Sequence, residues 1–245
     1  PRRCKYIWLG TRKKFDAFTF AFEETQWGWF QLHAYRFDGD TSTVIVETPE
    51  ENWVAAGLDQ MSAEDNIRFC ETLFARYLDG NPLISNASHL KSPWLNFWHI
   101  VNRHWIHKHI LLLGDAAHTA HFSIGSGTKL ALEDAITLNR SLLECTDLGS
   151  ALQAYQDVRE IEVLKLQNAA RNSTEWFENV KRYSAFEAEQ FAYSLLTRSQ
   201  RREAEAMGRR PVGFLARLED DLRASDRFEV AYENRDAVVF QVAER

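Results

Sequence analysis

The stretch from residue 111 to residue 135 constrains this chain most, because it joins a strand signal, a loop of small residues and a helix start. Three leucines followed by Gly114 and Asp115 predict a buried strand that ends in an acidic turn. Further along, Gly125 and Gly127 let another group approach the backbone closely. The helix expected after them directs its free N–H groups and positive dipole end at this loop. The stretch therefore predicts a cradle for an electron-rich ligand.

Composition narrows the class of protein. The chain has 245 residues, 45% of them hydrophobic, and a net charge of −6 without a basic stripe. A globular fold is expected, and a nucleic-acid partner is not. The sequence contains neither a signal peptide nor an apolar run near the roughly 20 residues that span a bilayer, so no membrane partner is expected. Three widely spaced cysteines fit a reducing compartment, and we expect a cytoplasmic protein.

Residues 5–48 predict antiparallel sheet. Apolar side chains alternate along 15–22 and 27–35, residues 38–40 form a hairpin turn, and 43–47 is rich in β-branched residues. The expected fold class is α+β, with a sheet-based part over residues 1–100.

One face of this sheet carries hydrogen-bonding side chains between aromatic rings, among them Gln31, His33 and Tyr35. A partly solvated face is the default interpretation for an antiparallel sheet. The alternative interpretation is a lining for an aromatic ligand. The pattern leaves both open.

Helices are expected in the rest of the chain. A capping box at Ser62–Asp65 opens one that runs to residue 78. Others are expected from Gly127 to about 146, from 151 to 170 or beyond with Asp147 and Ser150 as possible caps, and over 172–193. Short strands are expected at 95–101 and 110–113. The tail has a charged stretch and weak hairpin character over 228–242. The expected division is a strand–turn–loop–helix segment at 101–146 that carries the Gly114–His118 turn, C-terminal helices at 147–198 and a charged linker or tail at 199–245.

Two common kinds of site are disfavoured. Five of the eight histidines lie between His104 and His121, but their spacing matches no zinc motif, so no metal site is expected. Ser126 stands between two glycines, but Gly-x-Ser-x-Gly is absent, which argues against a serine hydrolase.

The turn at Gly114–His118 is more informative. A carboxylate held at Asp115 after a strand can accept hydrogen bonds from the hydroxyls of a sugar-like chain. The loop at Gly125 and Gly127 offers backbone donors to a flat, electron-accepting ring. The ordinary alternative is a strand–loop–helix unit with Asp115 as a turn residue. The length of the whole run favours the ligand site.

This run resembles the second flavin-binding motif of the p-hydroxybenzoate hydroxylase-like aromatic monooxygenases. The family pattern is Gly-Asp-Ala-Ala-His, a Pro, Gly-x-Gly-x-Asn and a helical Asp-Ala pair. Phe122 stands here in place of Pro, and Lys129 in place of Asn. Together with Gly28–Gln31 and Gln167–Ser173, these departures resemble the branch of salicylyl-CoA 5-hydroxylase and 2-aminobenzoyl-CoA monooxygenase, which acts on aromatic acyl-CoA thioesters.

The resemblance implies an FAD site. Asp115 would bind the ribityl hydroxyls, and N–H groups at the helix start would face N1 and the C2 carbonyl of the flavin ring. His121 and Phe122 would lie beside the ring, and the sheet face with Gln31, His33 and Tyr35 would roof the substrate. The implied cofactor-binding residues are Gly114, Asp115, Gly125, Ser126, Gly127, Thr128 and Lys129.

The resemblance also implies the chemistry. NAD(P)H would reduce FAD, O2 would form a flavin C4a-hydroperoxide, and a hydroxyl group would be transferred to an aromatic substrate, as in the degradation of aromatic compounds. The branch resemblance implies an aryl-CoA thioester as that substrate. Two alternatives stay open: an FAD reductase of the same superfamily, and a non-catalytic interaction module without bound flavin.

The Gly-x-Gly-x-x-Gly fingerprint that holds the ADP half of FAD is absent from the sequence. We therefore expect a piece of a longer protein, with fused domains on either side left open, as is a homo-oligomer. We also expect that these residues alone bind FAD weakly or not at all. A stoichiometric yellow flavoprotein purified from them would contradict this.

Overall fold

The computed structural model describes residues 1–85, 93–108, 110–199, 228–233 and 238–242. The chain forms two compact units, Pro1–Ile100 and Val101–Arg245, and each is described by itself.

The first unit is built on one antiparallel sheet, as expected. Its strand order is β2-β3-β4-β1-β5, and β6 also pairs with β1. The central strand β4 is buried along its whole length, which suits its β-branched sequence. The strands are β1 (Cys4–Thr11), β2 (Thr19–Thr25), β3 (Gly28–Arg36), β4 (Ser42–Pro49), β5 (Leu83–Ile84) and β6 (Trp94–Asn96).

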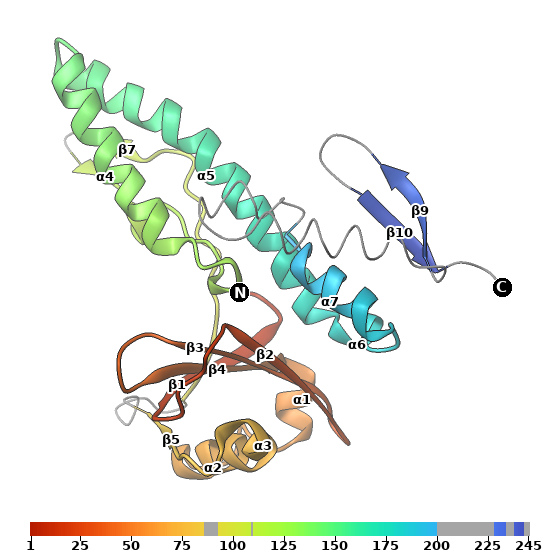
Figure 1. Ribbon diagram of the computed structural model, residues 1–245. Coiled ribbons are helices and arrows are strands. Elements are labelled where there is room, and N and C mark those ends of the chain that lie inside the picture. The colour runs from red at the N-terminus through yellow and green to blue at the C-terminus, as the bar shows by residue number, and fades with distance from the viewer. Residues whose placement is uncertain (86–92, 109, 200–227, 234–237, 243–245) are drawn as a thin grey trace. The chain divides into compact units, whose positions relative to one another are not determined.

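Three helices cover one face of this sheet (Figure 1): α1 (Glu50–Ala55), α2 (Ala63–Leu73) and α3 (Ala75–Leu78). The Asp65 N–H donates to Ser62 Oγ at 3.1 Å, so the predicted cap of α2 is confirmed. The expected single helix is divided at Phe74, whose buried ring packs with Phe30 and Leu32 of the sheet in the core. The alternation along β3 therefore identified the apolar face correctly.

The opposite face differs from the default expectation. Gln31 and His33 are each 1% exposed, so this part of the sheet is not partly solvated. Gln31 lies opposite the buried Glu47 of β4, and Phe20 of β2 lies opposite His33. Polar side chains can be buried here because they bond to one another, as Gln31 Nε2 does to Glu47 Oε2 at 3.1 Å.

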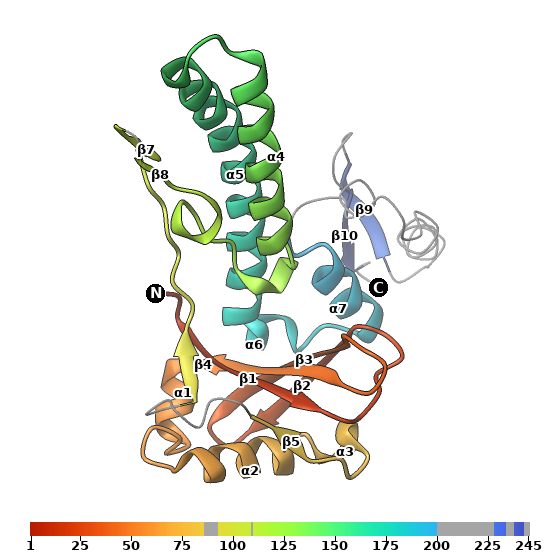
Figure 2. The same ribbon diagram turned by 90° about the vertical axis from the view of Figure 1, so that its left-hand side faces the viewer.

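The second unit is mainly helical. Its two longest helices, α4 and α5, lie side by side (Figure 2). Its elements are β7 (Ile106–His107), β8 (Ile110–Leu111), the 3-10 turns η1 (Gly114–Ala116) and η2 (Phe122–Ile124), α4 (Gly127–Glu144), α5 (Leu148–Glu178), α6 (Val180–Tyr183), α7 (Ala188–Leu196), β9 (Phe228–Glu233) and β10 (Val238–Val242).

Several boundaries differ from the predicted ones. Asp147 caps α5 as expected, because it accepts from the Ser150 N–H at 3.0 Å. However, α5 continues without a break to Glu178, and α6 and α7 replace the single helix expected over 172–193. The strand expected at 95–101 ends at Asn96, and the one expected at 110–113 ends at Leu111. Such short strands depend on partners that local sequence does not identify.

The buried face of α4 is only partly apolar. Leu132 and Ile136, which indicate a helix by their spacing, are 60% and 66% exposed. The face turned inward carries Leu130, Asp134, Thr137 and Ser141. A buried carboxylate on this face is tolerated because it has cationic and N–H partners, described below.

The hairpin expected over 228–242 is confirmed as β9 paired antiparallel with β10. The charged stretch after Ser199 and the turn expected at 233–236 lie largely outside the described residues. In the part of the chain that the structure describes, no helix is both long and apolar enough to cross a membrane.

Candidate functional site

The loop between β8 and α4, residues 114–126, is the candidate site; we call it the flavin-motif loop. It begins at Gly114, which is buried and has a φ of +56°. A Cβ at this position would lie 3.2 Å from the Ala131 Cβ of α4. Glycine is therefore needed here for its backbone conformation and for close packing against the helix.

Asp134 of α4 holds the start of this loop. Its Oδ2 accepts from the Gly114 N–H at 2.9 Å and lies 2.8 Å from His118 Nε2. Its Oδ1 accepts from Arg159 Nε of α5 at 2.7 Å. Asp134, His118 and Arg159 are all buried. One carboxylate thus joins the loop to both long helices.

The charge on Asp134 is stabilised by these partners. Burial by itself would raise the pKa of this carboxyl. Hydrogen bonds from His118, Arg159 and the Gly114 N–H outweigh burial, and the pKa is held below its usual value. Burial beside the Asp134 carboxylate also raises the pKa of the Tyr155 hydroxyl.

Asp115 differs from Asp134 in its surroundings. It lies in η1, directly after the buried Gly114, and its side chain is exposed. Its carboxylate is therefore available to accept hydrogen bonds from ligand hydroxyls.

The second half of the loop is open on one side. Gly125 has a φ of +61°, and a Cβ placed on it or on Gly127 would meet no atom within 4 Å. His121 is buried and Phe122 is half-buried, and their ring centroids lie 4.1 Å apart. Ser126, also half-buried, donates to the Ile124 carbonyl oxygen at 3.2 Å.

The start of α4 is uncapped. The side chain of the N-cap residue Ser126 makes no capping hydrogen bond to it. The N–H groups of the first turn, on Gly127, Thr128 and Lys129, therefore keep their donor capacity beside the open side of the loop. Lys129 forms an ion pair with Glu133 on the surface of the helix. An exposed carboxylate, open glycines and an uncapped helix start fit the ribityl chain and ring of a flavin.

We expect Gly125→Ala to destabilise the chain by about 1 kcal/mol, because an L-residue with a positive φ is strained. Gly127→Ala is the matched control, since Gly127 lacks a positive φ and also has open space around it. Urea unfolding of both variants measures the difference. Equal stabilities would contradict the backbone argument.

Three side chains hold the loop or its anchor Asp134, and motif reasoning gave them no such role: Arg159 and Gln167 of α5, and Arg198 directly after α7. Arg159 bonds to Asp134, Gln167 Nε2 donates to the Thr119 carbonyl oxygen at 3.0 Å, and Arg198 Nη2 donates to the Ser123 carbonyl oxygen at 2.8 Å. The segment Gln167–Ser173 was part of the resemblance to the acyl-CoA branch, but no structural role was predicted for it. Its first residue supports the loop directly.

The substrate-binding residues predicted in the sheet share one face of the first unit. Gln31 and His33 are buried with Glu47, and His33 Nε2 lies 3.4 Å from Glu47 Oε2. Tyr35 is half-buried and stacks on Phe18, with the ring centroids 5.2 Å apart. Glu47 was not predicted to belong to this face. The alternation of residues along β4, which places Thr43, Ile45 and Glu47 on one side, is the signal that could have identified it. Burial, followed by the Glu47 charge, raises the pKa of Tyr6 on the adjacent strand.

Across the described residues, no group of three or more His, Cys, Asp or Glu side chains is placed to hold a metal ion. His118 and His121 have structural contacts instead: the first with Asp134, the second through Nδ1 with the Ser123 N–H at 3.2 Å.

The comparison with family models identifies the family of this chain. Residues 10–169 match the model of the FAD binding domain. The chain belongs to the FAD binding domain family. The resemblance seen in the flavin-motif loop is thereby confirmed at the level of the family, and so is FAD as its cofactor class.

Relatives of this FAD-binding chain include named monooxygenases. It is 43% identical over 207 residues to a salicyloyl-CoA 5-hydroxylase from Streptomyces, covering 80% of this chain and 39% of the relative. It is 39% identical over 172 residues to a 3-hydroxy-4-methyl-anthranilyl-[aryl-carrier protein] 5-monooxygenase from Streptosporangium sibiricum, covering 70% and 44%. The chain thus spans less than half the length of these two relatives.

Solved structures agree with this fold. PqsL from Pseudomonas aeruginosa, in complex with 2-aminobenzoylacetate, aligns with a TM-score of 0.54 at 17% identity, covering 74% of this chain and 50% of that one. At this identity the likeness concerns the fold alone, and it agrees with the expected α+β class.

Proposed function

We propose that this chain is the part of a flavin-dependent monooxygenase that carries the ring half of the FAD site, and that the whole protein hydroxylates an aromatic acyl thioester. The observation that supports this best is the 43% identity to salicyloyl-CoA 5-hydroxylase over most of the chain. The open flavin-motif loop, with Asp115 exposed in its first turn, is compatible with that chemistry.

In this proposal the residues of the loop bind and orient the cofactor. Asp115 accepts hydrogen bonds from the ribityl hydroxyls. The N–H groups of Gly127, Thr128 and Lys129 stabilise negative charge on the ring, assisted by the dipole of α4. Gly114, Gly125 and Ser126 shape the backbone that carries these groups.

FAD, reduced by NAD(P)H, supplies the activation of O2, and the protein supplies orientation and exclusion of water. We assign His121 and Phe122 to contact with the aromatic substrate. We also assign to substrate binding the sheet face with Gln31, His33 and Tyr35, because it combines aromatic rings with polar groups.

The thioester is the specific part of the proposal. One of the two relatives described is named for a CoA thioester and the other for a substrate on an aryl-carrier protein. Both names describe an aromatic acyl group attached to a carrier. A substrate presented in this way is therefore favoured over a free aromatic acid.

The test uses the full-length protein with bound FAD. We expect salicyloyl-CoA to be hydroxylated with incorporation of one atom from isotopically labelled O2, detected by mass spectrometry. Its kcat/KM should exceed that of free salicylate by at least about tenfold, because contacts with the carrier group are lost in the free acid. Parallel assays with NADH and NADPH identify the electron donor.

Each alternative predicts a different result. NAD(P)H oxidation with peroxide release and no labelled product, for any aromatic thioester tried, would indicate a reductase and contradict the proposal. A full-length protein that retains no FAD would indicate an interaction module.

A further inference from the structure

Arg198, directly after α7, reaches the flavin-motif loop. Its Nη2 donates to the Ser123 carbonyl oxygen at 2.8 Å, and its Nε donates to Ser173 Oγ of α5 at 3.0 Å. Its Nη1 donates to the carbonyl oxygen of Leu195, in the last turn of α7, at 2.6 Å. One guanidinium therefore joins the loop, the long helix and the end of α7.

The side chain is held in a defined position. Its guanidinium carbon lies 5.1 Å from the centroid of the buried Phe177 ring. Ser173, which accepts from Nε, is also fully buried. A planar group fixed on an aromatic face and by three hydrogen bonds presents its donors in one geometry. A lysine ammonium cannot reproduce this arrangement.

Other hydrogen bonds of the described residues near Ser123 are local. The Ser123 N–H donates to His121 Nδ1 and the Gly125 N–H to the Phe122 carbonyl oxygen, so these bonds stay inside the loop. The Ser126 carbonyl oxygen accepts from Leu130 in the first turn of α4. Among the hydrogen bonds of the described residues, the one from Arg198 connects Ser123 to α5 and the end of α7. The bonded carbonyl of Ser123 lies two residues before Gly125, the loop residue with a φ of +61°.

We propose that Arg198 is a positioning residue of the flavin site: by holding the Ser123 carbonyl, it fixes the path of the loop into α4 and so sets the affinity for FAD. This inference rests on the proposed role of the loop in flavin binding. Arg198 itself is not placed against the cofactor. It acts through Ser123 and the backbone that follows.

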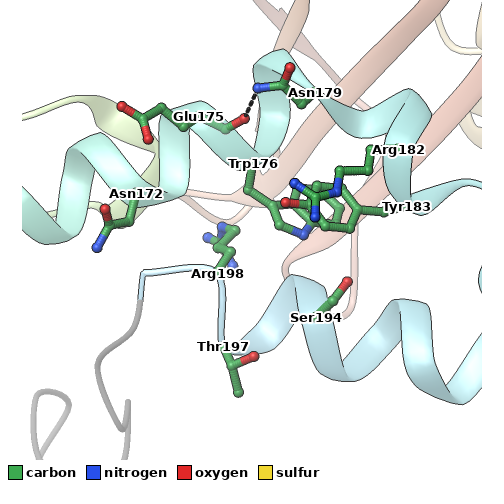
Figure 3. Close-up of a pocket in the computed structure, with 9 residues that line it drawn as sticks. All are labelled: Asn172, Glu175, Trp176, Asn179, Arg182, Tyr183, Ser194, Thr197 and Arg198. Atoms are coloured by element: carbon green, nitrogen blue, oxygen red, sulfur yellow. Dashed lines mark hydrogen bonds between the residues drawn. The ribbon is translucent and has the colours of Figure 1, made fainter. Parts of the chain in front are cut away.

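The structure offers a matched control in Arg182. Both arginines line a pocket of about 480 Å³ formed by α5, α6 and the end of α7. Figure 3 shows Arg182 beside Tyr183, and Arg198 between α5 and the end of α7. The Arg182 guanidinium lies 5.9 Å from the centroid of the Tyr183 ring, and its side chain is exposed. It has the same charge and length but makes no bond to the loop.

The first test needs no flavin. Hydrogen exchange of the amides of residues 123–126 is measured in the flavin-free 245-residue chain. Arg198→Ala should exchange about tenfold faster there, because loss of one charge-assisted hydrogen bond frees the loop. Arg198→Lys should also lose protection, whereas Arg182→Ala should match the wild type. If the Ala variant is poorly folded, the Lys variant still tests the proposal, because it keeps the charge and a long side chain and loses only the guanidinium geometry.

The second test measures FAD affinity of the full-length protein by flavin fluorescence. We expect about tenfold weaker binding in Arg198→Ala and no change in Arg182→Ala. Because Arg198 lines an open pocket, added methylguanidinium should enter the space left by the side chain and restore part of the affinity. Rescue of this kind is not expected for a role in folding alone.

Unchanged exchange in Arg198→Ala, or faster exchange with unchanged FAD affinity, would overturn the proposal. Equal effects of the two arginines would also overturn it. Failure of the wild type to hydroxylate any substrate would count only against the proposed function, since neither measurement depends on turnover.

Discussion

Asp134→Asn is expected to lower the free energy of unfolding by about 3–5 kcal/mol, the largest stability effect of any single change considered for this chain. The substitution removes the charge that faces the buried Arg159 guanidinium, 2.7 Å away. It also weakens the bonds to His118 and to the Gly114 N–H. A buried cation is then left without its main counter-charge. Urea unfolding of the 245-residue chain measures the loss.

Glu133→Gln is the control for this prediction. Glu133 lies one position earlier on α4 and also contacts Arg159, at 3.3 Å, but it is partly exposed. Its loss should therefore cost no more than about 1 kcal/mol. A comparable loss of unfolding free energy in both variants would show that burial of the Asp134–Arg159 pair is not the cause of the effect.

The same pair predicts a pH dependence. Because the pKa of Asp134 is lowered in the folded chain, its contribution to stability is fully present above the unfolded value of about 3.9. The contribution is lost as the pH falls from there through the lower folded pKa. Below about pH 4, the wild type should therefore lose stability more steeply than Asp134→Asn. Parallel curves of unfolding free energy against pH for the two proteins would show that Asp134 is not the source of this pH dependence.

Asp115→Ala is expected to weaken FAD binding by about hundredfold while leaving the fold intact. The proposed role of Asp115 is to accept hydrogen bonds from two ribityl hydroxyls, and each charge-assisted bond is worth about tenfold or more in affinity. The side chain is exposed in the structure, so its removal should change unfolding by no more than about 0.5 kcal/mol. Flavin titration of the full-length protein measures the affinity.

The exposed Glu144, at the end of α4, supplies the control Glu144→Gln, which should change neither property. Asp115→Asn should fall between wild type and Ala, because the amide keeps one acceptor and loses the charge. An unchanged affinity in Asp115→Ala would remove the central residue of the proposed cofactor site. The two aspartates should therefore have distinct effects. Substitution of Asp134 should lower the free energy of unfolding, and substitution of Asp115 should lower the affinity for FAD.

Local signals in the sequence were sufficient for much of this protein. Alternation predicted the antiparallel strands and the apolar face around Phe30 and Leu32. The side-chain cap at Ser62 predicted the start of α2 to within a residue, and Asp147 was one of two caps expected for α5, which begins three residues before the expected residue 151. The contiguous run from Gly114 to Lys129 indicated the flavin family, because its turn, loop and helix start lie next to one another in the chain. Each of these signals acts over a few residues, within the range where sequence dictates conformation.

The tertiary structure decided what lies across long separations. The motif includes Asp134 in its helical Asp-Ala pair but does not give its partner: only folding brings Asp134 to Arg159, 25 positions away, where both are buried. Apolar spacing on α4 pointed to Leu132 and Ile136, yet the face that packs on α5 carries the carboxylate, since a partnered charge can be buried there. Arg198 and Ser123 are 75 positions apart, and no local pattern links them. Pairings of this kind depend on how helices pack, and side-chain periodicity does not encode that.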